Sequence, residues 1–187
     1  ESINDVVVKA RDIMDFLKSI ARLVASENLP VCWTTPKPLN FPVQMMCYKK
    51  ESKRVKTKMG DSIIKLSIQS DTDEIDKRKT AQSICPNLIH SLDASCLMLA
   101  VIKAKDKGVT NFSLIHDSFG CVAPDVHKLS EAIREAFCEV YEQDVLTNWA
   151  MEMKQMLSDK NAKKFPHIPE RGNLDLSLVK QSIFFCV

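Results

Sequence analysis

NFSLIHDSFGCVA, residues 111–123, is the stretch that decides how the second half of the chain folds. Short apolar runs, 111–115 and 119–123, flank His116-Asp117, which predicts a strand-turn-strand with these two residues at its tip. An aspartate in a turn commonly accepts hydrogen bonds from the turn backbone. The same carboxylate, fixed on a rigid hairpin, also suits a hard cation such as Mg²⁺. On these two residues alone, both interpretations stay open.

Helices are predicted on both sides of this hairpin. Apolar residues recur at helical spacing in four long stretches and one short one: 2–28, 87–107, 125–143, 144–160 and 175–182. The helix over 87–107 is expected to begin at Ser83 or Asn87, with Pro86 in its first turn, and to end at Gly108.

The N-terminal half also contains strand signals. Residues 31–35 and 43–50 are predicted strands, and 53–69 is a predicted hairpin with Gly60-Asp61 at its turn. The polar run 70–82 is expected to be a loop with one helical turn. Together these elements predict an α+β fold, mainly helical, with small antiparallel β-hairpins.

Composition narrows the class of protein. A chain of 187 residues that is 45% hydrophobic can bury one substantial core, and its net charge of +2 is too small to argue for nucleic-acid binding by itself. Seven scattered cysteines form no C-x-x-C pair, which indicates reduced thiols in the cytoplasm and no zinc site. No apolar run is expected to reach the roughly 18 residues that a membrane span needs. Because the chain opens without Met, a processed protein and a fragment of a longer chain both stay open.

Basic residues crowd the first arm of the predicted hairpin and the residues just before it. Against one acid, Glu51, stand six bases: Lys49, Lys50, Lys53, Arg54, Lys56 and Lys58. A solvated surface hairpin is one interpretation. The other is a two-stranded ribbon in the DNA major groove, with basic side chains on phosphates and one or two on base edges.

His90 lies on the apolar helix over 87–107, where a lone histidine is usually a core residue. Its neighbours Asn87, Ser91 and Asp93 form a polar stripe, however, as on a helix that lines a cleft, so both interpretations stay open. Asp93 is also a formal candidate for a second metal-binding carboxylate. Serine-hydrolase chemistry is poorly supported because Ser118 stands in no G-x-S-x-G motif. The four glycines form no phosphate-binding loop.

Taken together, the chain resembles the C-terminal portion of the phage-type, single-subunit DNA-directed RNA polymerases. Three segments carry the resemblance in this order: 85-CPNLIHSLDAS-95, 114-LIHDSFG-120 and 171-RGNLDLSLVKQSIFF-185. The segments 31-VCWTTP-36 and 41-FPVQMMCYKK-50 also fit the family. Because Ser-Phe-Gly after the aspartate is more phage-like than mitochondrial, a bacteriophage polymerase in the cytoplasm of a bacterial host is expected.

The resemblance implies a right-hand polymerase that makes RNA from nucleoside triphosphates with two Mg²⁺ ions. Residues 1–90 would be part of the fingers, with a promoter-specificity hairpin at about 43–69. Residues 91–187 would be the C-terminal part of the palm, with the catalytic hairpin 111–123 and a short foot, 184–187. The implied site residues are Asp117 as metal ligand, His116 beside it, His90 near the growing RNA end, and Lys53, Arg54, Lys56 and Lys58 on promoter DNA.

Departures from the family pattern matter as well. The family's first catalytic aspartate and its nucleotide-binding helix have no counterpart here, so the implied partners include the N-terminal remainder of the polymerase besides promoter and template DNA, nascent RNA and nucleoside triphosphates. Alone, the fragment is expected to be inactive. Leu92 and Cys96 also stand where the phage pattern often has other residues. Two alternatives remain: a non-catalytic DNA-binding fragment, and the palm of a related DNA polymerase, in which Glu usually stands at the position of Ser118.

Overall fold

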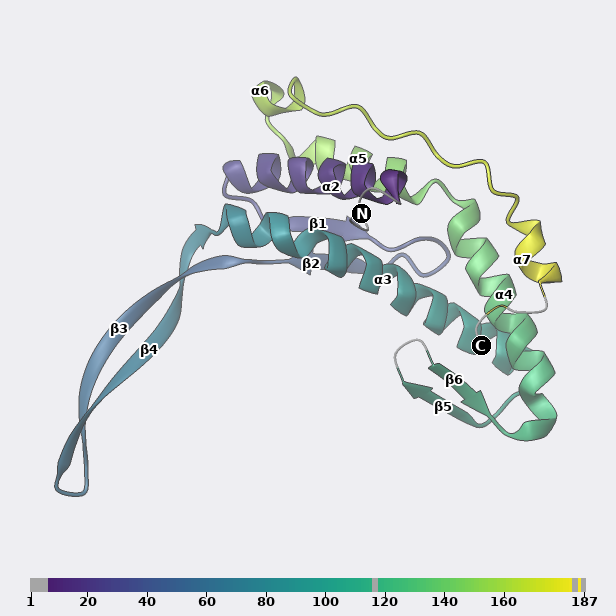
Figure 1. Cartoon of the computed structure of the whole chain (residues 1–187), viewed down its shortest axis with the longest axis horizontal. Helices are drawn as coiled ribbons and strands as arrows, with labels where there is room; N and C mark the ends of the chain where they lie inside the picture. Colours follow the sequence, from purple (N-terminus) through teal and green to yellow (C-terminus); the bar gives the residue numbers. More distant parts are fainter. Residues whose placement is uncertain (1–6, 116–117, 183–184, 186–187) are drawn as a thin grey trace.

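The computed structural model describes residues 7–115, 118–182 and 185, and it confirms an α+β fold (Figure 1). In chain order the elements are α2 (Val8–Ser26), β1 (Val31–Thr34), β2 (Pro42–Met45), β3 (Tyr48–Met59), β4 (Ser62–Ile75), α3 (Lys77–Asp106), β5 (Phe112–Ile115), β6 (Ser118–Cys121), η1 (Ala123–Asp125), α4 (Val126–Glu142), α5 (Val145–Met156), α6 (Asp159–Ala162) and α7 (Ser177–Gln181). Within the described part of the chain, the strands form three separate antiparallel pairs, β1–β2, β3–β4 and β5–β6.

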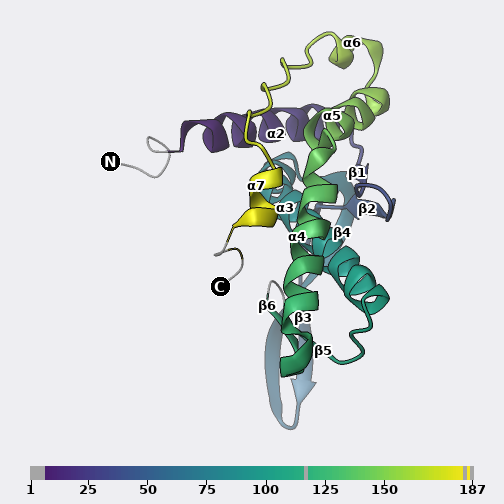
Figure 2. The ribbon, with the colours of Figure 1, turned by 90° about the vertical axis from the view of Figure 1, so that its right-hand side faces the viewer.

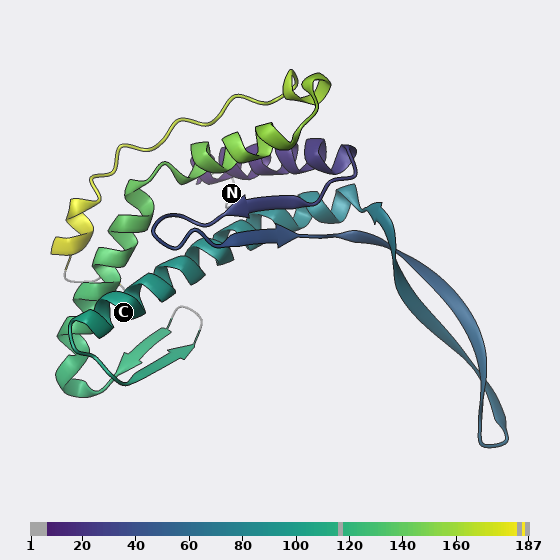
Figure 3. The same cartoon turned by 180° about the vertical axis from the view of Figure 1, so that it is seen from behind.

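The helix α3 is the central element of the fold, and different helices and strands pack against its two halves. Its N-terminal half packs with α2, α5 and the β1–β2 pair around the main core. Its C-terminal half packs against α4, and the β5–β6 hairpin lies beside this pair and packs against both helices (Figure 1). The ribbon β3–β4 projects from the N-terminal end of α3, so α3 links the ribbon to the hairpin (Figures 1 and 3).

The main core forms because apolar residues recur at helical spacing on α2 and meet the start of α3. Its most deeply buried members are Leu17, Ile20, Ala21, Val24, Val31, Trp33, Ile84, Trp149, Ala150 and Met153. Burial of one such large side chain contributes roughly 1.5–3 kcal/mol. This core therefore fixes the direction of α3.

The N-terminus of α3 lies well before the predicted start at Ser83 or Asn87, so the loop predicted over 70–82 is wrong. The carboxylate oxygen Oδ1 of Asp76 accepts hydrogen bonds from the backbone N–H groups of Arg78 and Lys79, each at 3.0 Å, and caps the helix. Thr80 and Ala81 are buried, whereas the charged residues 77–79 face solvent. Polar composition suggested a loop, but one apolar stripe and a cap suffice for a helix, even with Pro86 in its interior.

The ribbon β3–β4 is longer than the predicted hairpin over 53–69. The turn at Gly60-Asp61 is as predicted, and Gly60 takes the left-handed φ of 62° that this turn needs. Pairing continues to Glu51↔Ser70 and Lys50↔Asp71, and Tyr48 pairs with Ile75 beyond a register shift. The predicted strand 43–50 is instead divided between β2, which pairs with β1, and the start of β3.

The C-terminal segment returns to α4, beside which α7 lies (Figure 2). The Arg134 guanidinium donates to the Ser182 carbonyl at 3.0 Å, and the rings of Phe137 and Phe185 lie 5.1 Å apart. The Arg171 guanidinium donates to the carbonyls of Tyr141 and Glu142. Of the predicted foot 184–187, only Phe185 belongs to the described residues.

The helix α3 is also long and apolar enough to cross a membrane, with a mean hydropathy of 1.4 over its most apolar stretch. The expectation that no run reaches this length is therefore wrong. Since α3 packs against α2 and α4, and core helices often meet the same criterion, length and composition are weak evidence for a span.

Candidate catalytic hairpin and nucleic-acid interface

The two strands predicted to flank His116-Asp117 are confirmed as β5 and β6. The register pairs Ile115 with Ser118, so His116 and Asp117 are the two residues that connect the strands. Both lie outside the described residues, and their roles stay predictions. Two-residue connections hold the ends of paired strands close together, which restricts where the connecting side chains can lie.

Packing of Phe119 fixes the hairpin on the body of the molecule. Phe119 contacts both small cores between α3 and α4, one around Leu99 and Ala136 and the other around Ala104 and Leu129. Phe112 and Cys121 join the second of these cores. The chain on either side of the His-Asp connection is therefore attached to two helices, as a rigid support for a metal ligand requires.

His90 is exposed, so its interpretation as a core residue is wrong. Leu88, Leu92 and Ser95 face the core, and the intervening helical positions turn His90 and Asp93 to solvent. Ser91 does not join this exposed stripe, because its hydroxyl accepts a hydrogen bond from Trp33 Nε1 at 3.1 Å.

Asp93 lies near the partly buried phenol of Tyr141. Burial, with smaller contributions from the nearby Cys96 and Asp93, raises the pKa of Tyr141 on α4 to about 12. Among the described residues, no group of three or more His, Cys, Asp or Glu side chains could hold a metal ion. Within the described residues, Asp93 therefore belongs to no such group.

The basic residues predicted to contact DNA all lie exposed on β3, but on two different faces of the ribbon. Side chains alternate between faces along a strand, so Arg54, Lys56 and Lys58 share one face and Lys53 lies on the other. Lys65 of β4 is paired with Lys56 and joins the first face. Sequence reasoning missed Lys65, although the Gly60-Asp61 turn already implied this register.

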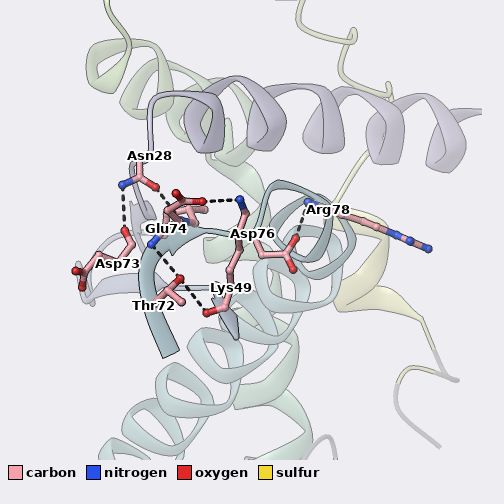
Figure 4. Close-up of polar contacts among 8 residues, drawn as sticks. Asn28, Lys49, Thr72, Asp73, Glu74, Asp76 and Arg78 are labelled. Carbon is pink, nitrogen blue, oxygen red and sulfur yellow. Dashed lines mark hydrogen bonds and ion pairs between the residues drawn. The ribbon is translucent and has the colours of Figure 1, made fainter. Parts of the chain in front are cut away.

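The base of the ribbon is held by polar contacts among residues from three elements (Figure 4). Lys49 Nζ lies 2.5 Å from Glu74 Oε2, and this hydrogen bond lowers the pKa of Glu74 and raises that of Lys49. The Asn28 amide donates to the Asp73 carbonyl at 3.1 Å and accepts from the Ile75 N–H at 2.7 Å. Lys49 is thus engaged within the protein, unlike the basic residues farther along the ribbon.

Asn28 should therefore contribute to stability through both its side chain and its backbone. Asn28→Gly removes two hydrogen bonds and should lower the free energy of unfolding by about 1–2 kcal/mol. Asn28→Ala should cost about 1 kcal/mol more, because alanine disfavours the left-handed φ of 59° that residue 28 adopts. Urea unfolding of the two variants measures both effects. Equal stability of the two variants would contradict the backbone contribution.

Comparison with known proteins gives one family and several plant relatives. The family model for DNA-dependent RNA polymerase matches residues 1–165. DNA-directed RNA polymerase 2, chloroplastic/mitochondrial, of Arabidopsis thaliana is 39% identical over 98% of this chain and 17% of that protein. The mitochondrial polymerase 1 of Nicotiana sylvestris is 35% identical over the same shares, and polymerase 2A of Nicotiana tabacum is 34% identical over 98% of this chain and 52% of that protein.

These relatives bear on the expected source. The chain spans 17% of the length of the first two relatives, so it corresponds to a small part of each. They are plant enzymes named for chloroplasts and mitochondria, and the expected bacteriophage source and bacterial cytoplasm find no support in them. The Ser-Phe-Gly triplet was too short a stretch to decide between branches of a family.

Proposed function

The chain belongs to the DNA-dependent RNA polymerase family of the phage-type, single-subunit kind, and on this premise we propose that it forms part of an enzyme that makes RNA on a DNA template. In this proposal it supplies one catalytic carboxylate, Asp117, and a DNA-contacting ribbon, β3–β4. The observation that carries the proposal is the hairpin β5–β6, which is attached to α3 and α4 and whose two connecting residues are His116-Asp117.

The proposed chemistry is phosphoryl transfer from a nucleoside triphosphate to the 3′ hydroxyl of the growing RNA. Bound in pairs, Mg²⁺ ions lower the barrier by activating that hydroxyl and stabilising the leaving pyrophosphate. Asp117 suits them chemically, since Mg²⁺ in such sites binds through one or two carboxylates plus substrate phosphates. The second carboxylate would come from outside this sequence, as would the nucleotide-binding helix.

The remaining site residues take supporting roles in this proposal. His116 positions the hairpin tip, and His90, exposed on α3, faces the end of the growing RNA. Residues 1–90 belong to the fingers with a specificity hairpin at about 43–69, and residues 91–187 belong to the palm. Promoter and template DNA, nascent RNA, nucleoside triphosphates and the rest of the polymerase are the partners.

An incorporation assay separates this function from its two alternatives. The complete polymerase chain that contains this sequence is incubated with duplex DNA, Mg²⁺, and either ribonucleotides or deoxyribonucleotides. We expect template-dependent incorporation of ribonucleotides that stops when EDTA removes the metal. Incorporation of deoxyribonucleotides alone would favour the related DNA polymerases, and DNA binding without incorporation would favour a non-catalytic fragment. The 187-residue chain assayed alone should incorporate neither, because one carboxylate cannot hold both metal ions.

A further inference from the structure

The ribbon β3–β4 has two faces of different chemistry. In an antiparallel pair, directly opposed residues point to the same face. One face carries the pairs Lys50↔Asp71, Ser52↔Gln69, Arg54↔Ser67, Lys56↔Lys65 and Lys58↔Ile63. The other carries Glu51↔Ser70, Lys53↔Ile68, Val55↔Leu66, Thr57↔Ile64 and Met59↔Ser62. A hydrogen bond of 2.5 Å between the hydroxyls of Ser52 and Ser67 supports the first assignment independently of the backbone register.

Net positive charge is concentrated on the first of these faces, called here the basic face. It carries five cations and a single acid, Asp71, whereas the opposite face carries one lysine and one glutamate. The opposite face is apolar yet open to solvent: Val55 is 36% exposed, Leu66 47%, Ile68 53% and Met59 72%. A ribbon that contacted only solvent would not need its basic and its apolar side chains on separate faces.

Within the described part of the chain, the cations of the basic face are also not neutralised by acidic partners. Lys56 stands directly opposite Lys65, and like charges in opposed positions destabilise a strand pair. Within the residues that the structure describes, none of Lys50, Arg54, Lys56, Lys58 and Lys65 forms an ion pair, whereas Lys49 at the base does. A row of exposed, mutually repelling cations on a two-stranded ribbon complements the phosphates that border a DNA groove.

Two side chains on this face are of the types that read base edges. The pairs Ser52↔Gln69 and Arg54↔Ser67 are neighbours along this face. Ser52 and Ser67 lie diagonally across the two strands and are hydrogen-bonded, and Arg54 and Gln69 lie on the other diagonal. Among the described residues, neither the Arg54 guanidinium nor the Gln69 amide makes a side-chain hydrogen bond. Arginine pairs in bidentate fashion with guanine and glutamine with adenine, whereas lysine acts as a point charge.

We propose that only the basic face of the ribbon contacts DNA, with Arg54 and Gln69 reading base edges and Lys50, Lys56, Lys58 and Lys65 contacting phosphates. Lys53, on the apolar face, makes no DNA contact. This inference rests on the proposed function and sharpens it, because it divides basic residues that are neighbours in sequence. It also implies that the bound DNA presents a guanine and an adenine close together.

Lys53 and Lys56 offer a matched test of the two faces, since both are exposed lysines on the same strand. The complete polymerase binds a fixed 40-base-pair duplex over a series of salt concentrations. Lys56→Ala should reduce the slope of log affinity against log salt by roughly one, the value for one lost phosphate contact. Lys53→Ala should leave the slope unchanged. Equal reductions in the two variants would overturn the division into faces.

Base reading is tested with duplexes selected from a random-sequence pool by the wild-type polymerase. Arg54→Lys keeps the positive charge but removes the planar guanidinium that can form two hydrogen bonds to guanine. Affinity for the selected duplex should therefore fall roughly 10- to 100-fold, while affinity for an unselected duplex barely changes. Gln69→Ala should relax the preference at an adenine. Unchanged preference in both variants would overturn the reading role. Face-dependent DNA binding by a wild-type chain that makes no RNA would instead refute the proposed function alone.

Discussion

Asp117→Asn should lower RNA synthesis by the complete polymerase roughly 10³-fold or more. The substitution keeps the size and shape of the side chain but removes the negative charge that Mg²⁺ requires. Strands β5 and β6 make all their described contacts through other residues, notably Phe112 and Phe119, so the fold should be retained. Initial rates of run-off transcription on a linear template measure the effect, and circular dichroism checks the fold.

Two other aspartates make this result specific. Asp106→Asn is the matched control, because Asp106 is exposed at the end of α3 and forms no ion pair among the described residues, so its rate should stay near that of the wild type. Asp93→Asn tests the formal candidate for a second carboxylate, and its loss should be far smaller than that of Asp117→Asn. Full activity in Asp117→Asn would refute the metal role, and a matching loss in Asp93→Asn would place the second ligand within this chain.

Local signals were sufficient where a turn or an apolar periodicity determined the structure. Gly60-Asp61 predicted the ribbon turn, and the runs around His116-Asp117 predicted β5 and β6 to within two residues. The loop predicted over 70–82 is wrong because residues 70–75 pair with β3, and residues 77–82 form a helix through the Asp76 cap and the burial of Thr80 and Ala81. Neither strand pairing nor helix capping requires a periodic pattern of apolar residues, so the polar sequence over 70–82 gave no sign of either element.

The candidate site shows the same limit in its side chains. Sequence grouped Lys53 with Arg54, Lys56 and Lys58 by composition, whereas alternation along β3 places it on the opposite face. This division could have been predicted, because the turn at Gly60-Asp61 fixes the register of the pairs from Met59↔Ser62 to Lys50↔Asp71. The exposure of His90 was not, because it depends on which side of α3 meets α2 and α5.

The main core connects these two parts of the site through α3. Residues of α2, β1 and α5 surround the N-terminal half of the helix, from which the ribbon projects. The C-terminal half packs against the hairpin β5–β6, for which we propose the catalytic role. Loosening the core should therefore reduce the stability on which the relative position of ribbon and hairpin depends.

Ile84→Ala should lower the free energy of unfolding by roughly 2–5 kcal/mol, because it removes buried methyl groups and leaves a cavity where α3 meets α2. Ile84 is 0% exposed, whereas Ile102, on the same helix, is 48% exposed. Ile102→Ala is therefore the matched control and should change stability by less than about 1 kcal/mol. Urea unfolding followed by circular dichroism measures both variants. Equal losses at the two positions would contradict the placement of the main core around the N-terminal half of α3.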